Sequence, residues 1–513
     1  MKVTCVLLTG ILALLAAGFC LAPTAWAEDA AVAATTEAKP AAPAAESKPA
    51  AEAKPATDAK PAAAPPVSKT GIACIDNLDD FFDKTKNPFP WMTWGADVRF
   101  RNEYVGNQTL NENAVNSGTR GKYLDYQRMR LRWWTTVTPV KDIDLNLRFE
   151  SEPRHFSNPE DTPTWNREQA VIDTANLKFT RVAGTPLTMT IGRQDIVLGE
   201  GWLVGDGTPI DGSRTSYFDA ARFSYDIAEI KTTADLMYVQ QDHRGNAMLP
   251  PLLSYEQNMT EQNERGLIFW VTNKSVKNTE INGYYMYKDL ERVRNVAGSD
   301  DGYINVFGGR IKGDLSDHWQ YRAEGAHQFG EKNNRHLRAF GANTQLAYLF
   351  KDPLKNQLRT FYEYTSGDDP DSRGTDEGFD SLWGRWPRWT DIYTISIVPG
   401  TGEGVIGEFT NLHRFGGGWT VAPLERLECT LDYHVLFAAT DSMAHAGPRG
   451  RRPAAFGADS LFRGQIVNFV MASNLTRHLK ARVVNEVFFP GGFYSDTRQQ
   501  TACFIRGELY FTW

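Results

Sequence analysis

Residues 94–103, WGADVRFRNE, decide the fold of this chain. Apolar residues alternate there with charged ones: Trp94, Ala96, Val98 and Phe100 against Asp97, Arg99, Arg101 and Glu103. Successive side chains of a β-strand point to opposite faces. The stretch therefore predicts a strand with one apolar face and one charged face.

The same alternation recurs at residues 128–133, RMRLRW, and at residues 143–150, IDLNLRFE. The alternating stretches are about twice as long as the five or six residues that are usual for strands of a soluble sandwich. A sandwich buries its apolar face, whereas an outer-membrane barrel turns that face to lipid. The length of the strands favours an all-β fold, a transmembrane antiparallel β-barrel.

The lengths of the connections support this fold, because short turns and long loops alternate along the chain. The short turns lie at 138–142, 182–186, 226–230, 273–278, 314–317, 351–355, 422–426 and 476–478. The long loops lie at 106–121, 154–169, 195–215, 241–263, 290–302, 330–336, 367–407, 440–460 and 491–499. Eight turns and nine loops join 18 strands. The asymmetry is typical of bacterial outer-membrane barrels, with short turns and both termini periplasmic.

Composition excludes other classes. After the first 25 residues no run of 18 apolar residues occurs, which argues against a helical membrane protein. The 55 Lys and Arg against 62 Asp and Glu give a net charge of −7, which argues against nucleic acid as a partner. The last strand, CFIRGELYFTW at 503–513, ends on Trp513 and resembles the assembly signal of outer-membrane proteins.

The N-terminal region divides into three predicted segments. Residues 1–27 read as a secretory signal peptide, with Lys2, an apolar stretch and the cleavage site Ala25-Trp26-Ala27. Cys20 suggests a lipoprotein instead, but Phe19 stands where a small residue is needed. Residues 28–69 are rich in Ala, Pro, Lys and Glu and predict a disordered linker, either a spacer or a tether to peptidoglycan or a periplasmic export partner. Residues 70–90 form a pre-barrel periplasmic segment, and 91–513 the barrel.

If the apolar face meets outer-membrane lipid and lipopolysaccharide, the opposite face lines the lumen. Its basic residues number sixteen against twelve acids, an excess of four positive charges. The basic residues are Arg99, Arg101, Arg128, Arg130, Arg132, Arg148, Lys178, Arg222, Arg310, Lys312, Arg322, Arg359, Arg414, Lys480, Arg482 and Arg506. Arg offers a planar fork that matches carboxylates, which suits a path for an anionic polysaccharide. Alternatively, these side chains pair with acids across the wall.

Five motifs resemble the alginate export family of outer-membrane proteins. They are GRQDIVLGEGW at 192–202, RTSYFDAARF at 214–223, Gly367-Asp368-Asp369, FDSLWG at 379–384 and FPGGF at 489–493. The resemblance spans roughly residues 91–513. It implies an 18-stranded exporter whose lumen is narrowed by arginines and capped by loops, and which passes an anionic exopolysaccharide. The Ala/Pro linker is not part of the family pattern.

The resemblance adds Arg193 as a constriction arginine, although the alternation places it on the lipid side. A bulge at Gly192 would turn it inward. We also expect loops 195–215 and 367–407 to fold inward or across the mouth, since long loops are usually functional.

Motifs for chemistry are weak. Asp369, Asp371 and Asp380 are spaced as in a calcium loop, but Arg373 occupies a ligand position, so we expect no cofactor beyond, at most, a structural calcium ion. The nine His form no metallohydrolase motif. A passive exporter of an acidic polysaccharide is the first hypothesis. A general or small-anion porin is the alternative, and an outer-membrane enzyme the third.

Overall fold

The computed structural model describes residues 77, 80–81, 84–111, 122–158, 165–166, 170–205, 216–252, 259–385 and 387–513. The predicted signal peptide, the linker at 28–69 and residues 70–76 lie outside the described residues. So do parts of five predicted loops, among them 206–215.

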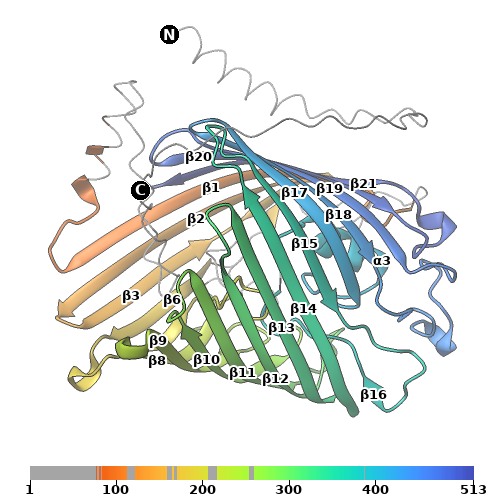
Figure 1. Cartoon of the computed structure of the whole chain (residues 1–513), viewed down its shortest axis with the longest axis horizontal. Coiled ribbons are helices and arrows are strands. Elements are labelled where there is room, and N and C mark those ends of the chain that lie inside the picture. Colours follow the sequence, from red (N-terminus) through yellow and green to blue (C-terminus); the bar gives the residue numbers. More distant parts are fainter. Residues whose placement is uncertain are drawn as a thin grey trace, which may run out of the picture. The chain divides into compact units, whose positions relative to one another are not determined.

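Eighteen antiparallel strands form a closed barrel, because the first strand pairs with both the second and the last (Figure 1). The fold predicted from the sequence is confirmed, including the number of strands. The strands of the wall are β1 (Met92–Gly106), β2 (Tyr123–Val140), β3 (Ile143–Ser151), β6 (Ala170–Phe179), β7 (Leu187–Gln194), β8 (Phe218–Ile227), β9 (Thr232–Gln241), β10 (Asn263–Asn273), β11 (Thr279–Glu291), β12 (Gly302–Asp314), β13 (Trp319–Lys332), β14 (Arg335–Leu349), β15 (Gln357–Thr365), β17 (Leu412–Leu424), β18 (Leu427–Phe437), β19 (Phe462–Asn474), β20 (Leu479–Pro490) and β21 (Ala502–Thr512).

Three short strands belong to loops. β4 (Arg154–Asn158) follows β3 after Glu152 and Pro153 and pairs with β2, so it prolongs the wall beyond β3. β5 (Trp165–Asn166) pairs with β4. β16 (Thr375–Asp376) lies parallel to the start of β14.

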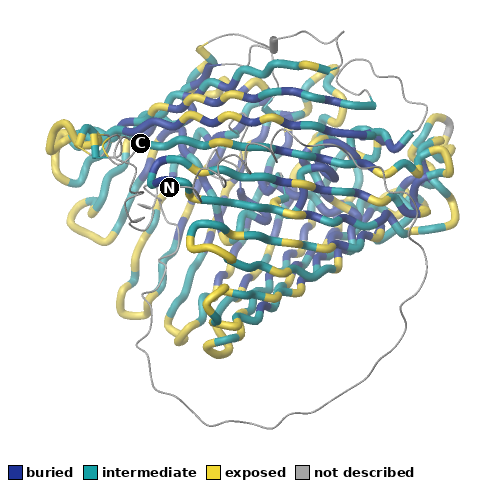
Figure 2. The backbone as a smooth tube through the Cα atoms, turned by 90° about the horizontal axis from the view of Figure 1, so that it is seen from above, coloured by how far each residue is buried: buried dark blue, intermediate teal, exposed yellow. Residues whose placement is uncertain are grey.

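The two faces of the wall differ as the alternation predicts. On β1, Val98 and Phe100 are 42% and 41% exposed, whereas their neighbours Asp97 and Arg99 are 0% and 4% exposed. Buried and more accessible residues alternate along most of the wall, and exposed residues gather at the hairpin ends (Figure 2). The apolar side chains thus form the outer surface and the charged ones the interior. Among the described residues, no helix is long and apolar enough to cross a membrane.

The eight predicted short turns each join two neighbouring wall strands. The predicted loop at 330–336 is wrong, because only Asn333 and Asn334 separate β13 from β14. Both residues have positive φ, 54° and 63°, which suits a two-residue hairpin and which Asn tolerates better than most residues. The remaining predicted long loops connect strands at the other end of the barrel, the long-loop end.

The residues before β1 lie against the short-turn end. The Trp94 indole donates to the Thr85 carbonyl at 2.8 Å, and Arg477 in the β19–β20 turn pairs with Asp80 at 3.2 Å. Trp513 exchanges two backbone hydrogen bonds with Ala96. The beginning and the end of the barrel sequence therefore lie side by side at this end.

Candidate substrate channel

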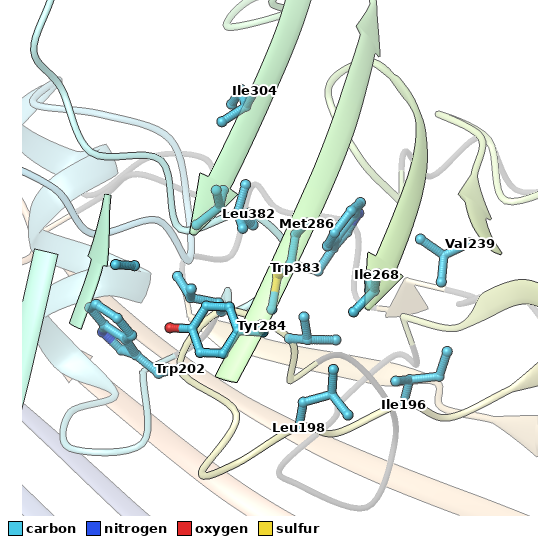
Figure 3. Packing of buried hydrophobic residues seen from close by; sticks show 14 of the residues in the cluster. Ile196, Leu198, Trp202, Val239, Ile268, Tyr284, Met286, Ile304, Leu382 and Trp383 are labelled. Atoms are coloured by element: carbon cyan, nitrogen blue, oxygen red, sulfur yellow. The ribbon is translucent and has the colours of Figure 1, made fainter. Parts of the chain in front are cut away.

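Two long loops enter the barrel near the long-loop end. From the first, residues 195–205, the side chains of Ile196, Leu198 and Trp202 are buried, and from the second, residues 376–411, those of Phe379, Leu382 and Trp383. They pack against the inward residues of β8 to β14, among them Met237, Ile268, Met286 and Ile304, in one cluster (Figure 3). Burial of this apolar surface fixes both loops to the wall.

The two loops also bond to each other. The Trp383 N–H donates to the Leu203 carbonyl at 2.9 Å, and the Gly205 N–H donates to the Trp383 carbonyl at 3.1 Å. Trp202 stacks on Phe379 with ring centroids 5.3 Å apart. The predicted inward folding of these loops is thus present in their described parts.

Glycines in the wall make room for the loop aromatics. A Cβ at Gly266 on β10 would lie 2.3 Å from the Trp383 ring, and one at Gly341 on β14 would lie 2.6 Å from the Phe379 ring. A larger side chain would fit at neither position unless the loop or the wall shifted. The wall sequence is therefore matched to the loops that it holds.

Polar contacts anchor the second loop at its turn. Lys288 on β11 donates to the Leu382 carbonyl at 2.9 Å, and Lys332 on β13 pairs with Asp380 at 3.2 Å. Burial alone would raise the pKa of Asp380, but Lys288 and Lys332 lower it below its ordinary value. Gln328 binds both the N–H and the carbonyl of Asp380.

The second loop then crosses to the opposite wall. Residues 390–401 include a π-helical turn (Tyr393–Ile397) and α3 (Val398–Thr401), which lies inside the barrel behind β17 to β19 in Figure 1. Ile392 and Ile397 are buried against inward residues of β18 to β21. Arg506 pairs with Asp391 at 3.0 Å. One loop therefore contacts both sides of the barrel and narrows its interior.

The five predicted arginines of β1 and β2, which we call the arginine ladder, lie on the inward face, and each of them contacts a carboxylate. Arg99 and Arg128 pair with Glu152 at 2.8 and 3.0 Å, and Arg132 donates to Asp97 at 2.7 Å. Arg101 pairs with Glu508, and Arg130 lies 3.4 Å from Asp97. All five arginines are less than a tenth exposed. The ladder therefore pairs with acids of the wall, as in the alternative interpretation of the sequence.

Four further predicted arginines also have acidic partners on the inward face. They are Arg148 with Asp173 at 2.8 Å, Arg222 with Asp235 at 3.0 Å, Arg359 with Asp432 at 2.6 Å and Arg414 with Glu363 at 2.8 Å. Glu363 also accepts the indole N–H of Trp202 at 3.0 Å, so one carboxylate joins the wall to the first loop.

Arg193 differs from the other nine. Both β-ladders run through Gly192 without a shift in register, so the predicted bulge is wrong. Arg193 therefore lies on the same face of β7 as Ile191, which is exposed. Asp219 is its partner on β8 and lies on the same face of the wall. It is nevertheless fully buried.

Residues 242–252 supply part of the cover over Arg193. Its guanidinium donates to both carboxylate oxygens of Asp219 at 2.7 and 3.0 Å and to the Leu249 carbonyl at 3.0 Å. It also lies 3.8 Å from the centre of the Tyr217 ring. These contacts make Arg193 an anchor for a loop on the outer face of the wall and not a lumen residue.

A more accessible basic group than the arginine ladder surrounds Glu200 on the first loop. Glu200 lies 2.6 Å from Arg310, 3.4 Å from Lys312 and 3.5 Å from Arg322. The side chains of Lys312 and Arg322 are 41% and 26% exposed, whereas Arg310 is fully buried. We call Glu200, Lys312, Arg322 and Arg388 the Glu200 cluster.

Arg388 on the second loop completes this cluster. It interacts electrostatically with Glu200 and Arg322. Among the described residues no hydrogen bond or ion pair holds its guanidinium. Burial among the surrounding residues lowers the pKa of Arg388. The residue is exposed to solvent. Burial alone would raise the pKa of Glu200, but Arg322, Lys312 and Arg310 together lower it.

Sequence reasoning included Lys312 and Arg322 among sixteen inward basic residues but missed Arg388. Its loop has no strand periodicity from which the direction of a side chain could be predicted. The only signal was the inward folding expected for the whole loop.

The weak calcium site is not formed by the described residues. Asp380 is paired with lysines, and Asp371 is 88% exposed in its side chain. No group of three or more His, Cys, Asp or Glu side chains in the described part of the chain is placed to hold a metal ion.

A closed 18-stranded barrel with an apolar outer face and a loop-narrowed interior defines an outer-membrane channel. The chain belongs to the alginate export family: residues 90–507 match the family described as Alginate export. No curated protein matches the chain.

Several solved structures are similar. Pseudomonas aeruginosa OccD3 (OpdP) is 8% identical with a TM-score of 0.50, over 82% of this chain and 91% of that chain. Pseudomonas aeruginosa OccK11 (OpdR) is 14% identical with a TM-score of 0.49, over 82% and 95%. Acinetobacter baumannii OccAB4 is 9% identical with a TM-score of 0.49, over 83% and 100%. At these identities the likeness concerns the fold alone.

Proposed function

We propose that this protein passes an anionic polysaccharide such as alginate through its barrel, without chemistry, and that the Glu200 cluster is where the polymer meets positive charge. The observation that carries the proposal is the accessible charge at the narrowed interior. Lys312, Arg322 and Arg388 are three accessible cations against one accessible acid, Glu200. A low-dielectric wall strengthens the field of such a group.

The arginines of the ladder have a different role in this proposal. Each is less than a tenth exposed and lies against a carboxylate, so little of its guanidinium is open to a passing polymer. The ladder holds the wall and the loops in place, whereas the accessible cluster binds. A carboxylate of the polymer then gives up hydrogen bonds to water and accepts hydrogen bonds from the planar guanidinium of Arg322 or Arg388.

The orientation follows from the same architecture. We place the short-turn end, with both barrel termini, in the periplasm and the long-loop end outside the cell. Residues 1–27 would be a signal peptide and 28–69 a linker to the barrel. A periplasmic export partner or peptidoglycan would bind this linker if it is more than a spacer.

A triple variant tests the binding group: Lys312→Glu, Arg322→Glu and Arg388→Glu together. In planar bilayers at 0.1 M salt we expect the parent channel to prefer anions and to be blocked by uronate oligomers. The variant should lose both properties, because the three accessible positive charges become negative. Arg265→Glu, on the outward face of β10, is the matched control and should leave both unchanged.

The alternative function, a general or small-anion porin, makes a different prediction. Such a channel would conduct strongly from the outset, and uronate oligomers would not block the parent. That result would end the polysaccharide proposal even if anion preference were present.

A further inference from the structure

The outer wall carries a pocket lined by aromatic and basic side chains at the long-loop end, away from the channel. It is an open hollow of about 460 Å³ over β12, β13 and β14, with Thr375 of β16 at its edge. The side chains that matter for its chemistry are Tyr303, Asn305, His327, Phe329, His336 and Arg338. None of the residues that line it is acidic.

Strand register shows that this pocket opens on the lipid side. Arg338 pairs with Phe329 across β14 and β13, and Phe329 pairs with Asn305 on β12. The next row, further from the hairpin, consists of Phe340, His327 and Phe307. Phe329, Phe340 and Phe307 are 38%, 47% and 56% exposed, so these rows belong to the apolar outer face.

The depth of Arg338 corresponds to the membrane interface. It lies four residues beyond Asn334 of the β13–β14 hairpin, which is about 13 Å along the strand. The row of Phe340, His327 and Phe307 lies next to it, further from the hairpin. Such aromatic rows are typical of the girdles at the boundary of the hydrocarbon. A charged side chain at this depth reaches lipid headgroups.

Arg338 is exposed, and no described side chain pairs with it. The nearest acid in the register, Glu331, lies beside His336 in the row toward the hairpin and is not part of the lining. Arg265, another outward arginine at this end, differs because it pairs with Glu291 at 3.5 Å. An unpaired cation that faces lipid calls for an anion from the membrane.

We propose that this pocket binds the phosphate of an outer-leaflet glycolipid of the lipid A class. The forked guanidinium of Arg338 and the ring N–H groups of His327 and His336 would donate to the phosphate oxygens. The rings of Phe329 and Tyr303 would contact the sugar and the start of the acyl chains. The site depends on the proposed orientation but not on what the channel carries.

The test uses the full-length protein in detergent and native mass spectrometry, with bisphosphorylated lipid A as the probe. The parent should retain one lipid A and bind it about tenfold more tightly than phosphatidylglycerol. Arg338→Gln should weaken binding about tenfold, equivalent to about 1.4 kcal/mol. Arg338→Lys should recover part of it, and His327→Gln with His336→Gln should weaken it independently.

Arg265→Gln is the matched control, and it should bind lipid A as the parent does. Heat-modifiable gel migration confirms that each variant forms the barrel. Any one of four results would overturn the proposal: parent-like binding by Arg338→Gln, an equal loss in Arg265→Gln, equal affinity for phosphatidylglycerol, or displacement of lipid A by millimolar inorganic phosphate. A change in oligomeric state of lipid-free Arg338→Gln would assign the face to a second copy of the chain instead. None of these results bears on uronate block, which tests the channel separately.

Discussion

At the residue scale, the register of the strands decides which carboxylate each inward arginine meets. The alternation in WGADVRFRNE and RMRLRW places the charged side chains of β1 and β2 on one face. That Arg132 faces Asp97, and that Glu152 holds Arg99 and Arg128, follows from the register of the strands and from the interruption after β3. A net charge count could not distinguish buried pairs from accessible cations.

Arg506 should be among the most sensitive positions in the interior. It is 1% exposed and pairs with Glu103 at 2.7 Å and Asp391 at 3.0 Å. Arg506→Leu leaves two carboxylates without this partner, and we expect it to destabilise the barrel by about 3–5 kcal/mol. Arg181→Leu is the control. Its side chain is 57% exposed in its pair with Asp142, and it should cost less than about 1 kcal/mol. The measurement is urea-induced unfolding in detergent; equal losses would show that burial does not govern these pairs.

Gly266 should determine how closely Trp383 of the second loop packs against the wall. Because its Cβ would lie 2.3 Å from the Trp383 ring, Gly266→Ala forces the loop or the wall to shift, at a cost of about 1–3 kcal/mol. We expect the loop to yield, since the wall is held by continuous ladders, and single-channel conductance to rise. Gly283→Ala on β11 is the matched control, because nothing lies within 4 Å of its Cβ. Unchanged conductance in Gly266→Ala would mean that Trp383 does not restrict the passage.

At the scale of elements, local sequence signals were sufficient for strands and short turns but not for loops. The period of two and the turn residues fixed all eight short turns. The error at 330–336 arose because Asn333-Asn334 was included in a longer polar stretch, although Asn tolerates the positive φ that a two-residue hairpin needs. The second loop contacts two opposite sides of the barrel. A pattern of neighbouring residues in the sequence cannot predict such contacts.

Deleting residues 370–390 should open the channel. The deletion removes Phe379, Leu382 and Trp383, the part of the second loop that contacts β8 to β14 and the first loop. It also removes Arg388. We expect single-channel conductance to rise several-fold while heat-modifiable migration on gels is retained, because every wall strand remains. A folded variant with the parent's conductance would show that this loop does not restrict flow.

At the scale of the whole molecule, the strand count was predictable because a barrel of antiparallel strands closes only with an even number of them. Short turns and long loops then alternate along the chain, and the apolar side chains of every strand face outward. The site was not predictable, because its accessible charges come from a wall and two loops that are far apart in the sequence. Lys312 and Arg322 come from neighbouring strands, while Glu200 and Arg388 are 188 positions apart. The identity of the functional cations depends on how the loops fill the closed barrel.

Because the functional cations are exposed to solution, the anion selectivity of the channel should depend on salt concentration. Ions screen charges over about 10 Å at 0.1 M but over about 3 Å at 1 M, and Lys312, Arg322 and Arg388 are open to the solution in the passage. The anion preference and the uronate block of the parent should therefore be strong at 0.1 M and weak at 1 M. The variant with all three residues changed to Glu should prefer cations at 0.1 M and approach the parent at 1 M. Reversal potentials under salt gradients around each concentration measure this. A parent preference that persists at 1 M would instead indicate selection by the width of the passage, because steric exclusion does not respond to ionic strength.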